Sequence, residues 1–341
     1  MNTQTKKPLN LAKLIVVSLG AALLASCNPT TSQEIKPIKI DGSSTVYPIT
    51  KAVAGAYKAN KQDPVDITVD FSGTGGGFSK FCAGQTDIQN ASRPIQTKEM
   101  EACKEGRVAY IELPVAFDAL AVVVNPDNNW INTITTEELK KIWEPAAEGK
   151  ITRWNQVRPN FPDKPLNLFG PGADSGTFDY FTEAIVGEAG ASRKDYVASE
   201  DDNILVEGVR QDPNALGYFG LAYYLLRPKE IRALAIDSGK GPVLPSKEAV
   251  AGAIYQPLAR PLFIYVNSAS AQKNPALRDF IDFYLDKAPE IVRDVGYVPL
   301  PEEAYHINSV TFYQGEVGTV FGGKSQLDLT IPELLRKRAQ Y

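Results

Sequence analysis

Histidine and cysteine are scarce in this chain: His306 is the one histidine among 341 residues, and the three cysteines include no C-x-x-C pair. A structural zinc site needs about four histidine or cysteine ligands, and a hydrolase triad needs a histidine beside its nucleophile. The scarcity argues against both chemistries, and His306 is expected at a surface turn. No catalytic residue, metal site or cofactor is predicted.

The chain also lacks an excess of positive charge, since 36 lysines and arginines face 40 aspartates and glutamates. Binding to a nucleic-acid backbone calls for a basic face, so nucleic acid is not expected as a partner. A mildly acidic protein can still bind a small anion when the field inside one cleft is positive. With 43% hydrophobic residues, the composition supports a large core and more than one domain.

A long membrane-spanning run is missing as well. The apolar segment 14–25 is shorter than the about 20 residues that a spanning helix needs, and three lysines precede it. Small residues and then Cys27 follow, which gives the layout of a secretory signal and resembles that of a bacterial lipoprotein. The resemblance implies cleavage before Cys27 and acylation of that cysteine. We expect residues 1–26 to be a signal peptide, 27–34 a polar tether, and the body to be lipid-anchored to the membrane in the periplasm.

Two cysteines remain once Cys27 is assigned to lipid, namely Cys82 and Cys103. An even pair in an exported chain is typical of a disulfide. This bond would close a loop of about 20 residues and would contribute about 3 kcal/mol to stability.

Short β-branched runs alternate with helical patterns along the chain, which predicts an α/β fold. The expected strands are 36–40, 65–71, 111–115, 120–124, 166–169 and 262–266. The expected helices are 49–57, 78–83, 135–143, 178–185 and 275–284.

Three stretches rich in glycine and hydroxyl groups, 42–46, 73–77 and 172–177, each precede a helix-like segment. A helix start has backbone N–H groups without intrahelical partners and a partial positive charge, so small hydroxyl residues there offer donors to a compact oxyanion. Any one stretch alone is more typical of a turn and an N-cap. Three in one chain favour an anion-binding site, and the first two follow predicted strands, where α/β sheets bind ligands.

A family resemblance rests on four motifs in order. They are Asp-Gly-Ser-Ser-Thr-Val-Tyr-Pro at 41–48, Gly-Thr-Gly-Gly-Gly at 73–77 followed by Ala-Ser-Arg-Pro at 91–94, Asp-Ser-Gly-Thr-Phe at 174–178, and Pro-Asn-Ala-Leu-Gly-Tyr at 213–218. The chain resembles the phosphate-binding subunit (PstS family) of bacterial high-affinity phosphate ABC transporters, over nearly its whole mature length. Within that family it is similar to the SphX-like subgroup.

The resemblance implies a two-lobed periplasmic binding protein of the class II type with a double crossover hinge. Residues 35–119 plus 262–341 would form lobe 1, residues 120–261 would form lobe 2, and the strands 120–124 and 262–266 would be the hinge crossings. Inorganic phosphate would lie between lobes that close on it, and the protein would deliver it to the membrane permease of a phosphate ABC transporter.

The ligand contacts that the resemblance implies come from all three glycine-hydroxyl stretches, with the N–H of Val46 as one donor. They are Ser44, Thr45, Val46, Thr74, Gly75, Arg93, Asp174, Ser175, Gly176 and Thr177. Glycine permits close approach of the backbone, and hydroxyl groups can orient toward whichever oxygen needs a proton.

One departure from the family pattern concerns charge. Well-studied members have an aspartate where this chain has Arg93, and an arginine where it has Pro171. We expect the pair to have changed sides, with Arg93 as the cationic donor and Asp174 as the acceptor for a phosphate proton, which sulfate lacks; Asp41 is the second candidate. The alternative is that Asp174 only caps the helix and Arg93 forms a surface ion pair.

Other functions are weighed against phosphate transport. Residues 318–325 fit the P-loop pattern G-x-x-x-x-G-K-[ST], but they lie near the C-terminus, which leaves no room for a nucleotide-binding domain. A secreted phosphatase, a binding protein for another tetrahedral oxyanion and a phosphate sensor remain as alternatives.

Overall fold

The computed structural model describes residues 1–5, 36–62, 65–327 and 329–338. The predicted tether and Cys27, and all of the predicted signal peptide beyond its first five residues, lie outside the described residues. Within the described part of the chain, no helix combines the length and the apolar character needed to cross a membrane.

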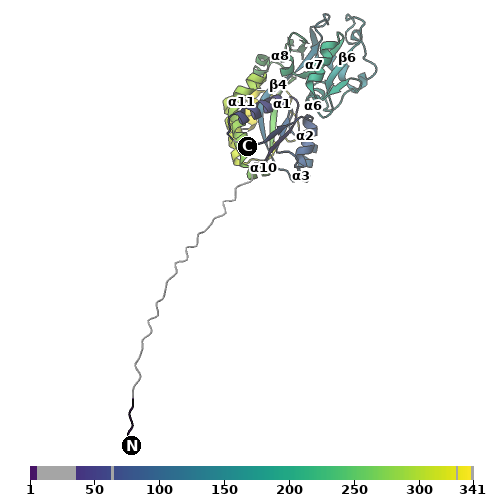
Figure 1. Ribbon diagram of the computed structural model, residues 1–341. Helices are drawn as coiled ribbons and strands as arrows, with labels where there is room; N and C mark the ends of the chain where they lie inside the picture. Colours follow the sequence, from purple (N-terminus) through teal and green to yellow (C-terminus); the bar gives the residue numbers. More distant parts are fainter. Residues whose placement is uncertain (6–35, 63–64, 328, 339–341) are drawn as a thin grey trace. The chain divides into compact units, whose positions relative to one another are not determined.

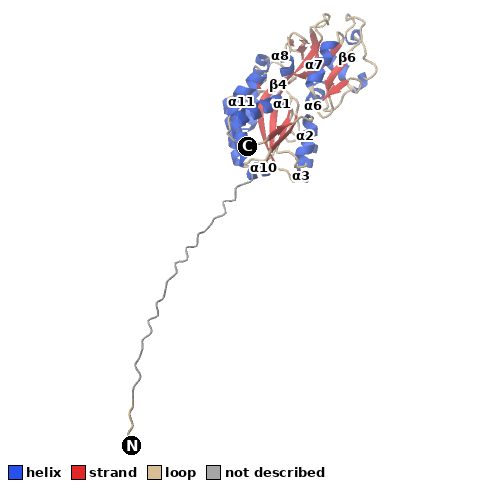
Figure 2. Ribbon diagram, viewed as in Figure 1, coloured by secondary structure: helices blue, strands red, loops and turns tan. Residues whose placement is uncertain are grey.

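A mixed sheet forms the centre of the fold, with the strand order β2-β1-β3-β12-β4-β8-β6-β7 (Figure 2). The strands are β1 (Ile38–Gly42), β2 (Ile67–Val69), β3 (Ile88–Ala91), β4 (Tyr110–Val124), β6 (Asn167–Pro171), β7 (Val197–Ser199), β8 (Ala215–Gly220) and β12 (Ala259–Asn267). Within it β1, β2 and β3 run parallel, as do β6, β7 and β8. Short strands β9 (Arg232–Ala233) and β13 (Val298–Pro299) also pair with β4. A second sheet contains β5 (Thr133–Thr135), β10 (Ala235–Asp237) and β11 (Pro242–Val243).

Strand β4 passes through both parts of the large sheet. The two strands expected at 111–115 and 120–124 are one strand, and all its residues are buried. Residues 110–119 pair with β12, whereas residues 120–124 pair with β8. We call the elements around β2, β1, β3 and β12 the first lobe, and those around β8, β6 and β7 the second lobe.

Helices cover the sheet, and the expected ones are present with shifted ends. Those of the first lobe are α1 (Tyr47–Ala59), α2 (Gly73–Cys82), α3 (Thr97–Glu105), α10 (Ser268–Lys273), α11 (Pro275–Val295) and α12 (Glu302–Gln314). Those of the second lobe include α4 (Thr136–Trp143), α5 (Trp154–Val157), α6 (Gly176–Ile185), α7 (Asp202–Gln211) and α8 (Leu221–Leu226). The remaining helices are η1 (Pro145–Ala147), α9 (Lys247–Ala251) and α13 (Ile331–Arg338).

Helices α1 and α11 lie side by side in the first lobe (Figure 1). Tyr57 of α1 makes edge-to-face contacts with Phe280 and Phe283 of α11, a favoured arrangement of aromatic rings. Helix α11 extends to Val295, well past the expected end at residue 284, and ends at Gly296, whose φ of 110° suits glycine.

The predicted disulfide between Cys82 and Cys103 is confirmed. It joins the last residue of α2 to α3, and both sulfur-bearing side chains are buried. The bond therefore fixes two helices of the first lobe to each other.

Candidate functional site

The three glycine-hydroxyl stretches lie where strands give way to helices. The first connects β1 to α1, and the third connects β6 to α6. We expected the second stretch to be a loop before a helix. Instead it forms the first turn of α2, whose first residue is Gly73. Two stretches thus come from the first lobe and one from the second, and each lies at a helix start, where N–H groups lack partners within the helix.

The structure brings these stretches together. The hydroxyl oxygens of Thr45 and Thr177 lie 3.2 Å apart across the two lobes. Those of Thr74 and Ser92 are also 3.2 Å apart, and a Cβ atom on Gly176 would come within 2.6 Å of both. We call Thr45, Thr74, Ser92 and Thr177 the hydroxyl cluster, and all four are buried.

Two serines hold the helix starts in place. The Ser175 hydroxyl accepts a hydrogen bond from the N–H of Thr177 at 3.1 Å, so Ser175 is the N-cap of α6. The alternative that Asp174 caps this helix is therefore wrong. In the first stretch, Ser43 accepts from the N–H groups of Thr45 and Val46, at 3.2 and 3.4 Å.

Ser44 and Gly75 flank the cluster through backbone contacts. The carbonyl oxygen of Ser44 accepts a hydrogen bond from the Tyr223 hydroxyl at 3.0 Å. The N–H of Gly75 donates to the carbonyl oxygen of Asp174 at 2.8 Å. Both bonds connect the first lobe to the second, so the two lobes are in contact around the hydroxyl cluster.

Arg260 supplies the positive charge of the cluster, and it was not predicted from the sequence. Its Nη2 lies 2.7 Å from the Thr177 hydroxyl and 3.4 Å from that of Thr45, and its Nη1 donates to the carbonyl oxygen of Gly176 at 3.1 Å. The side chain is fully buried. Its position could have been noticed in the sequence, because a lone arginine at the start of an apolar strand is a buried charge that needs partners.

Two buried carboxyl groups lie near this arginine, and neither was predicted. Asp118 of β4 approaches Arg260 Nη2 at 3.3 Å, and burial raises the pKa of Asp118 to about 6 although the arginine acts in the opposite direction. Asp202 begins α7, and burial raises its pKa to about 8. Arg260 again opposes this shift, whereas the Asp118 charge adds to it.

Arg93 does not pair with Asp174, so the predicted partner is wrong. Its guanidinium binds both oxygens of Glu99 at 2.8 Å and Asp179 at 2.7 Å. The side chain is 1% exposed, which also rules out the surface ion pair. Asp179 lies inside α6 and reaches Arg93 from the second lobe, whereas Asp174 precedes the helix and is exposed.

Asp41, the second candidate acceptor, is occupied by other groups. Its carboxylate accepts hydrogen bonds from the Gly42 N–H at 2.7 Å and the Ser72 hydroxyl at 2.9 Å, and it forms an ion pair with Lys80. Whether Asp41 or Asp174 accepts a proton from a ligand stays a prediction.

Asp202 makes a testable contribution to stability. The pKa of Asp202 is higher in the folded chain than the ordinary value of about 3.9 for aspartate. Between about pH 4 and pH 8, the folded chain therefore keeps a proton on Asp202 that the unfolded chain has already released. Stability therefore falls as pH rises through this window. We expect the melting temperature to fall more between pH 6 and pH 8 for the parent than for Asp202→Asn, as followed by circular dichroism. Parallel profiles would contradict the assignment.

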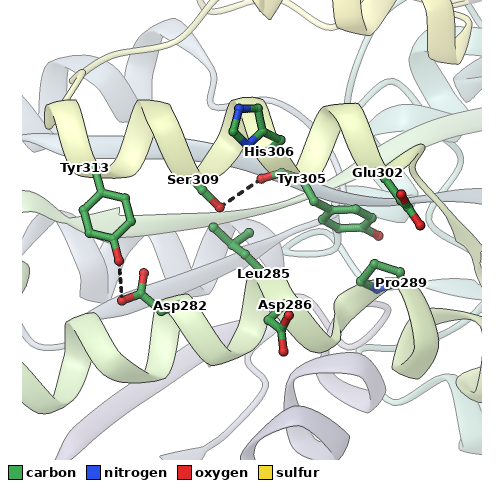
Figure 3. Close-up of a pocket in the computed structure, with 9 residues that line it drawn as sticks. All are labelled: Asp282, Leu285, Asp286, Pro289, Glu302, Tyr305, His306, Ser309 and Tyr313. Carbon is green, nitrogen blue, oxygen red and sulfur yellow. Dashed lines mark hydrogen bonds between the residues drawn. The ribbon is translucent and has the colours of Figure 1, made fainter.

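Other features that the sequence suggested lie outside the cluster. His306 lies on helix α12 rather than in a turn, and it lines a cavity of about 430 Å³ between α11 and α12 (Figure 3). None of the residues that line this cavity belongs to the three stretches. Residues 318–325 form turns without the helix that a P-loop requires, and Thr319 donates to the buried carboxylate of Glu112 at 2.5 Å.

Comparisons with known proteins agree with this arrangement. Residues 28–288 match the PBP superfamily domain. The chain is 60% identical to the protein SphX of Synechocystis over 96% of its length and 97% of the relative. It is 32% identical to the phosphate-binding protein PstS of Staphylococcus saprophyticus, over 91% of this chain and 95% of that one.

Solved structures show the same fold. A possible phosphate-binding protein from Planctomyces limnophilus is 42% identical with a TM-score of 0.61, and the match covers 83% of this chain and 99% of that one. A putative phosphate ABC transporter substrate-binding protein from Clostridium perfringens, with bound phosphate, is 25% identical with a TM-score of 0.65, over 78% of this chain and all of that one. The resemblance drawn from the motifs is thereby confirmed, and the chain belongs to the PstS family of the PBP superfamily, in its SphX-like branch.

Proposed function

We propose that this protein binds inorganic phosphate between its two lobes, at the hydroxyl cluster and Arg260, and delivers it to the membrane permease of a phosphate ABC transporter. The observation that carries the proposal is the position of Arg260. One buried guanidinium donates to a hydroxyl group of each lobe, Thr45 and Thr177. A cation with hydroxyl and N–H donors around it is the donor set that a tetrahedral oxyanion needs.

The ligand set of the proposal combines the predicted residues with those that the structure adds. The predicted residues 44–46, Thr74, Gly75 and 175–177 are kept, with Ser92 and Arg260 as additions. Where an N–H group of this set now donates to a protein oxygen, as that of Gly75 does to the Asp174 carbonyl, the ligand would replace that acceptor. Arg93 is assigned a different role, because its guanidinium donates to protein oxygens of Pro94, Glu99 and Asp179. It connects the lobes beside the ligand.

We infer a lipid anchor at Cys27 and a periplasmic location from the signal-like N-terminus, and lobes comprising 35–119 plus 262–341 and 120–261 that close on the anion. The relatives are binding proteins by name, which favours a binding function over catalysis. A secreted phosphatase would need an activated nucleophile or paired metal ligands, and the hydroxyl cluster contains neither.

Thr177→Val tests the site. The change keeps the shape of the side chain but removes a hydroxyl that lies between the two lobes, so we expect phosphate affinity to fall about tenfold to hundredfold, the usual effect of losing one hydrogen bond to a charged group. Thr45→Val should act likewise. Titration calorimetry with phosphate, and with sulfate as the competing oxyanion, measures both effects.

Thr182→Val is the matched control, because this buried threonine lies on the same helix and its hydroxyl bonds to backbone groups of Phe178, Asp179 and Gly190. Its phosphate affinity should equal that of the parent. A Thr177→Val protein that binds phosphate as tightly as the parent would place the ligand elsewhere. Equal binding of sulfate by the parent would favour the broader oxyanion alternative.

A further inference from the structure

The hydroxyl cluster lies beside a buried group of charges that does not balance. Arg260, Asp118 and Asp202 are 0%, 2% and 1% exposed. Arg260 forms an ion pair with Asp118, whereas no ion pair to Asp202 is present among the described residues. One oxygen of each aspartate, Oδ1 of Asp118 and Oδ2 of Asp202, is buried without a hydrogen-bond partner in that part of the chain. One guanidinium therefore faces two carboxyl groups.

Among the described residues, the charged groups that act most strongly on Asp202 include one cation, Arg260; the exposed Lys51 of α1 lines a neighbouring cavity with Asp201 and Asn203. On its own segment the neighbouring charged groups are Glu200 and Asp201, and across from it are Asp118 of β4 and Arg260 of β12. The charge of Asp202 also contributes to raising the pKa of two tyrosines, Tyr223 of α8 and Tyr297, which immediately precedes β13. All of these groups except Arg260 and Lys51 are acidic or neutral. An ionised Asp202 would thus be a buried charge with a shared counter-ion, which is costly.

We propose that phosphate binding is coupled to the uptake of one proton by Asp202, so that this carboxyl group is neutral in the complex. The inference rests on the proposed function, because it takes phosphate to bind at the hydroxyl cluster. Phosphate brings at least one negative charge to the same arginine, and a like charge nearby disfavours the ionised form of a carboxyl group. The proton leaves the acid form of the buffer, which keeps the electron pair of the broken bond, and bonds to an Asp202 oxygen.

Burial sets the pH at which the coupling becomes visible. The pKa of Asp202 is about 8 before the anion binds, so near pH 6 the group already holds its proton and binding draws none from solvent. Above about pH 8.5 most Asp202 is ionised, and each further pH unit should weaken phosphate binding by up to about tenfold.

Titration calorimetry of the parent with inorganic phosphate at pH 8.5, in two buffers of different ionisation enthalpy, measures the proton uptake. Asp202→Asn mimics the neutral carboxyl group and cannot titrate. We expect the parent to take up about 0.8 proton more per bound phosphate than this variant, the fraction of Asp202 that is ionised at that pH. At pH 6 the two should take up equal numbers. The affinity of Asp202→Asn should also fall less than that of the parent from pH 8 to pH 9.5.

Glu207→Gln is the control, because Glu207 lies on the same helix and forms an ion pair with Arg210 rather than acting on Asp202. Its proton uptake should match the parent's. Equal uptake by the parent and Asp202→Asn at pH 8.5 would overturn the proposal. Should Asp202→Asn fail to fold, a parent affinity that stays constant from pH 8 to pH 9.5 would overturn it, and a falling one would support it. A parent that binds no phosphate at any pH contradicts the proposed function instead.

Discussion

Replacing Arg260 with methionine is expected to lower the free energy of unfolding by about 3 to 5 kcal/mol, because it leaves a buried carboxylate without its counter-ion. The guanidinium is the ion-pair partner of Asp118 and also donates to the Gly176 carbonyl and the Thr177 hydroxyl. Methionine fills much of the same volume and has none of these donors. Urea unfolding at pH 7 measures the loss, and phosphate affinity should be lost with it.

Two further variants isolate the cause. Arg210→Met removes an exposed arginine that forms ion pairs with Glu207 and Glu230. Exposed ion pairs contribute about 0.2 to 1 kcal/mol to the free energy of unfolding, so the loss in this variant should be small. Asp118→Asn combined with Arg260→Met removes the buried charge as well, so this double variant should be more stable than Arg260→Met alone. A double variant that is less stable than Arg260→Met would show that the ion pair is not the source of the loss.

Removing the disulfide is the other large effect. Changing both Cys82 and Cys103 to alanine should lower the free energy of unfolding by about 3 kcal/mol, within the usual range of about 2 to 5 kcal/mol for a native disulfide. The bond closes a loop with a sequence separation of 21 and joins α2 to α3. Its loss frees the unfolded chain, which gains conformational entropy. Equilibrium unfolding in urea measures the difference.

Treatment with a reductant is the internal control. It should destabilise the parent and leave the double alanine variant unchanged. Phosphate affinity of the folded variant should stay within about twofold of the parent, because the bond lies at the far end of α2 from Thr74. A parent whose stability is unaffected by full reduction would contradict the assigned contribution.

The residues that sequence reasoning found share a local signature. Glycines and hydroxyl-bearing residues at the end of a strand indicate a turn and a helix start within a few positions. The stretches 42–46, 73–77 and 172–177 could therefore be located from the sequence alone. Their meeting in one cluster followed only from the family resemblance. The contact between Thr45 and Thr177 depends on how two lobes lie together, which no local pattern encodes.

The missed residues are isolated charges in apolar strands. Asp118 and Arg260 have mainly hydrophobic neighbours in β4 and β12, and hydrophobic periodicity marks such strands as core without explaining the charge. Arg93 was found, but its partner was not. Asp179 lies within α6, one turn after its start, and only the orientation of that helix decides that it, rather than Asp174, meets the arginine.

Strand β4 also bears on how the chain unfolds. The same continuous backbone supplies hydrogen bonds to β12 at one end and to β8 at the other, so neither lobe has a complete sheet without it. Melting of one lobe would release half of a strand whose other half is still held, and the freed half would expose apolar side chains. We therefore expect the two lobes to lose their structure together, in one cooperative transition, because one continuous hydrophobic core also runs through both. A shared strand thus makes the two halves behave thermodynamically as one unit.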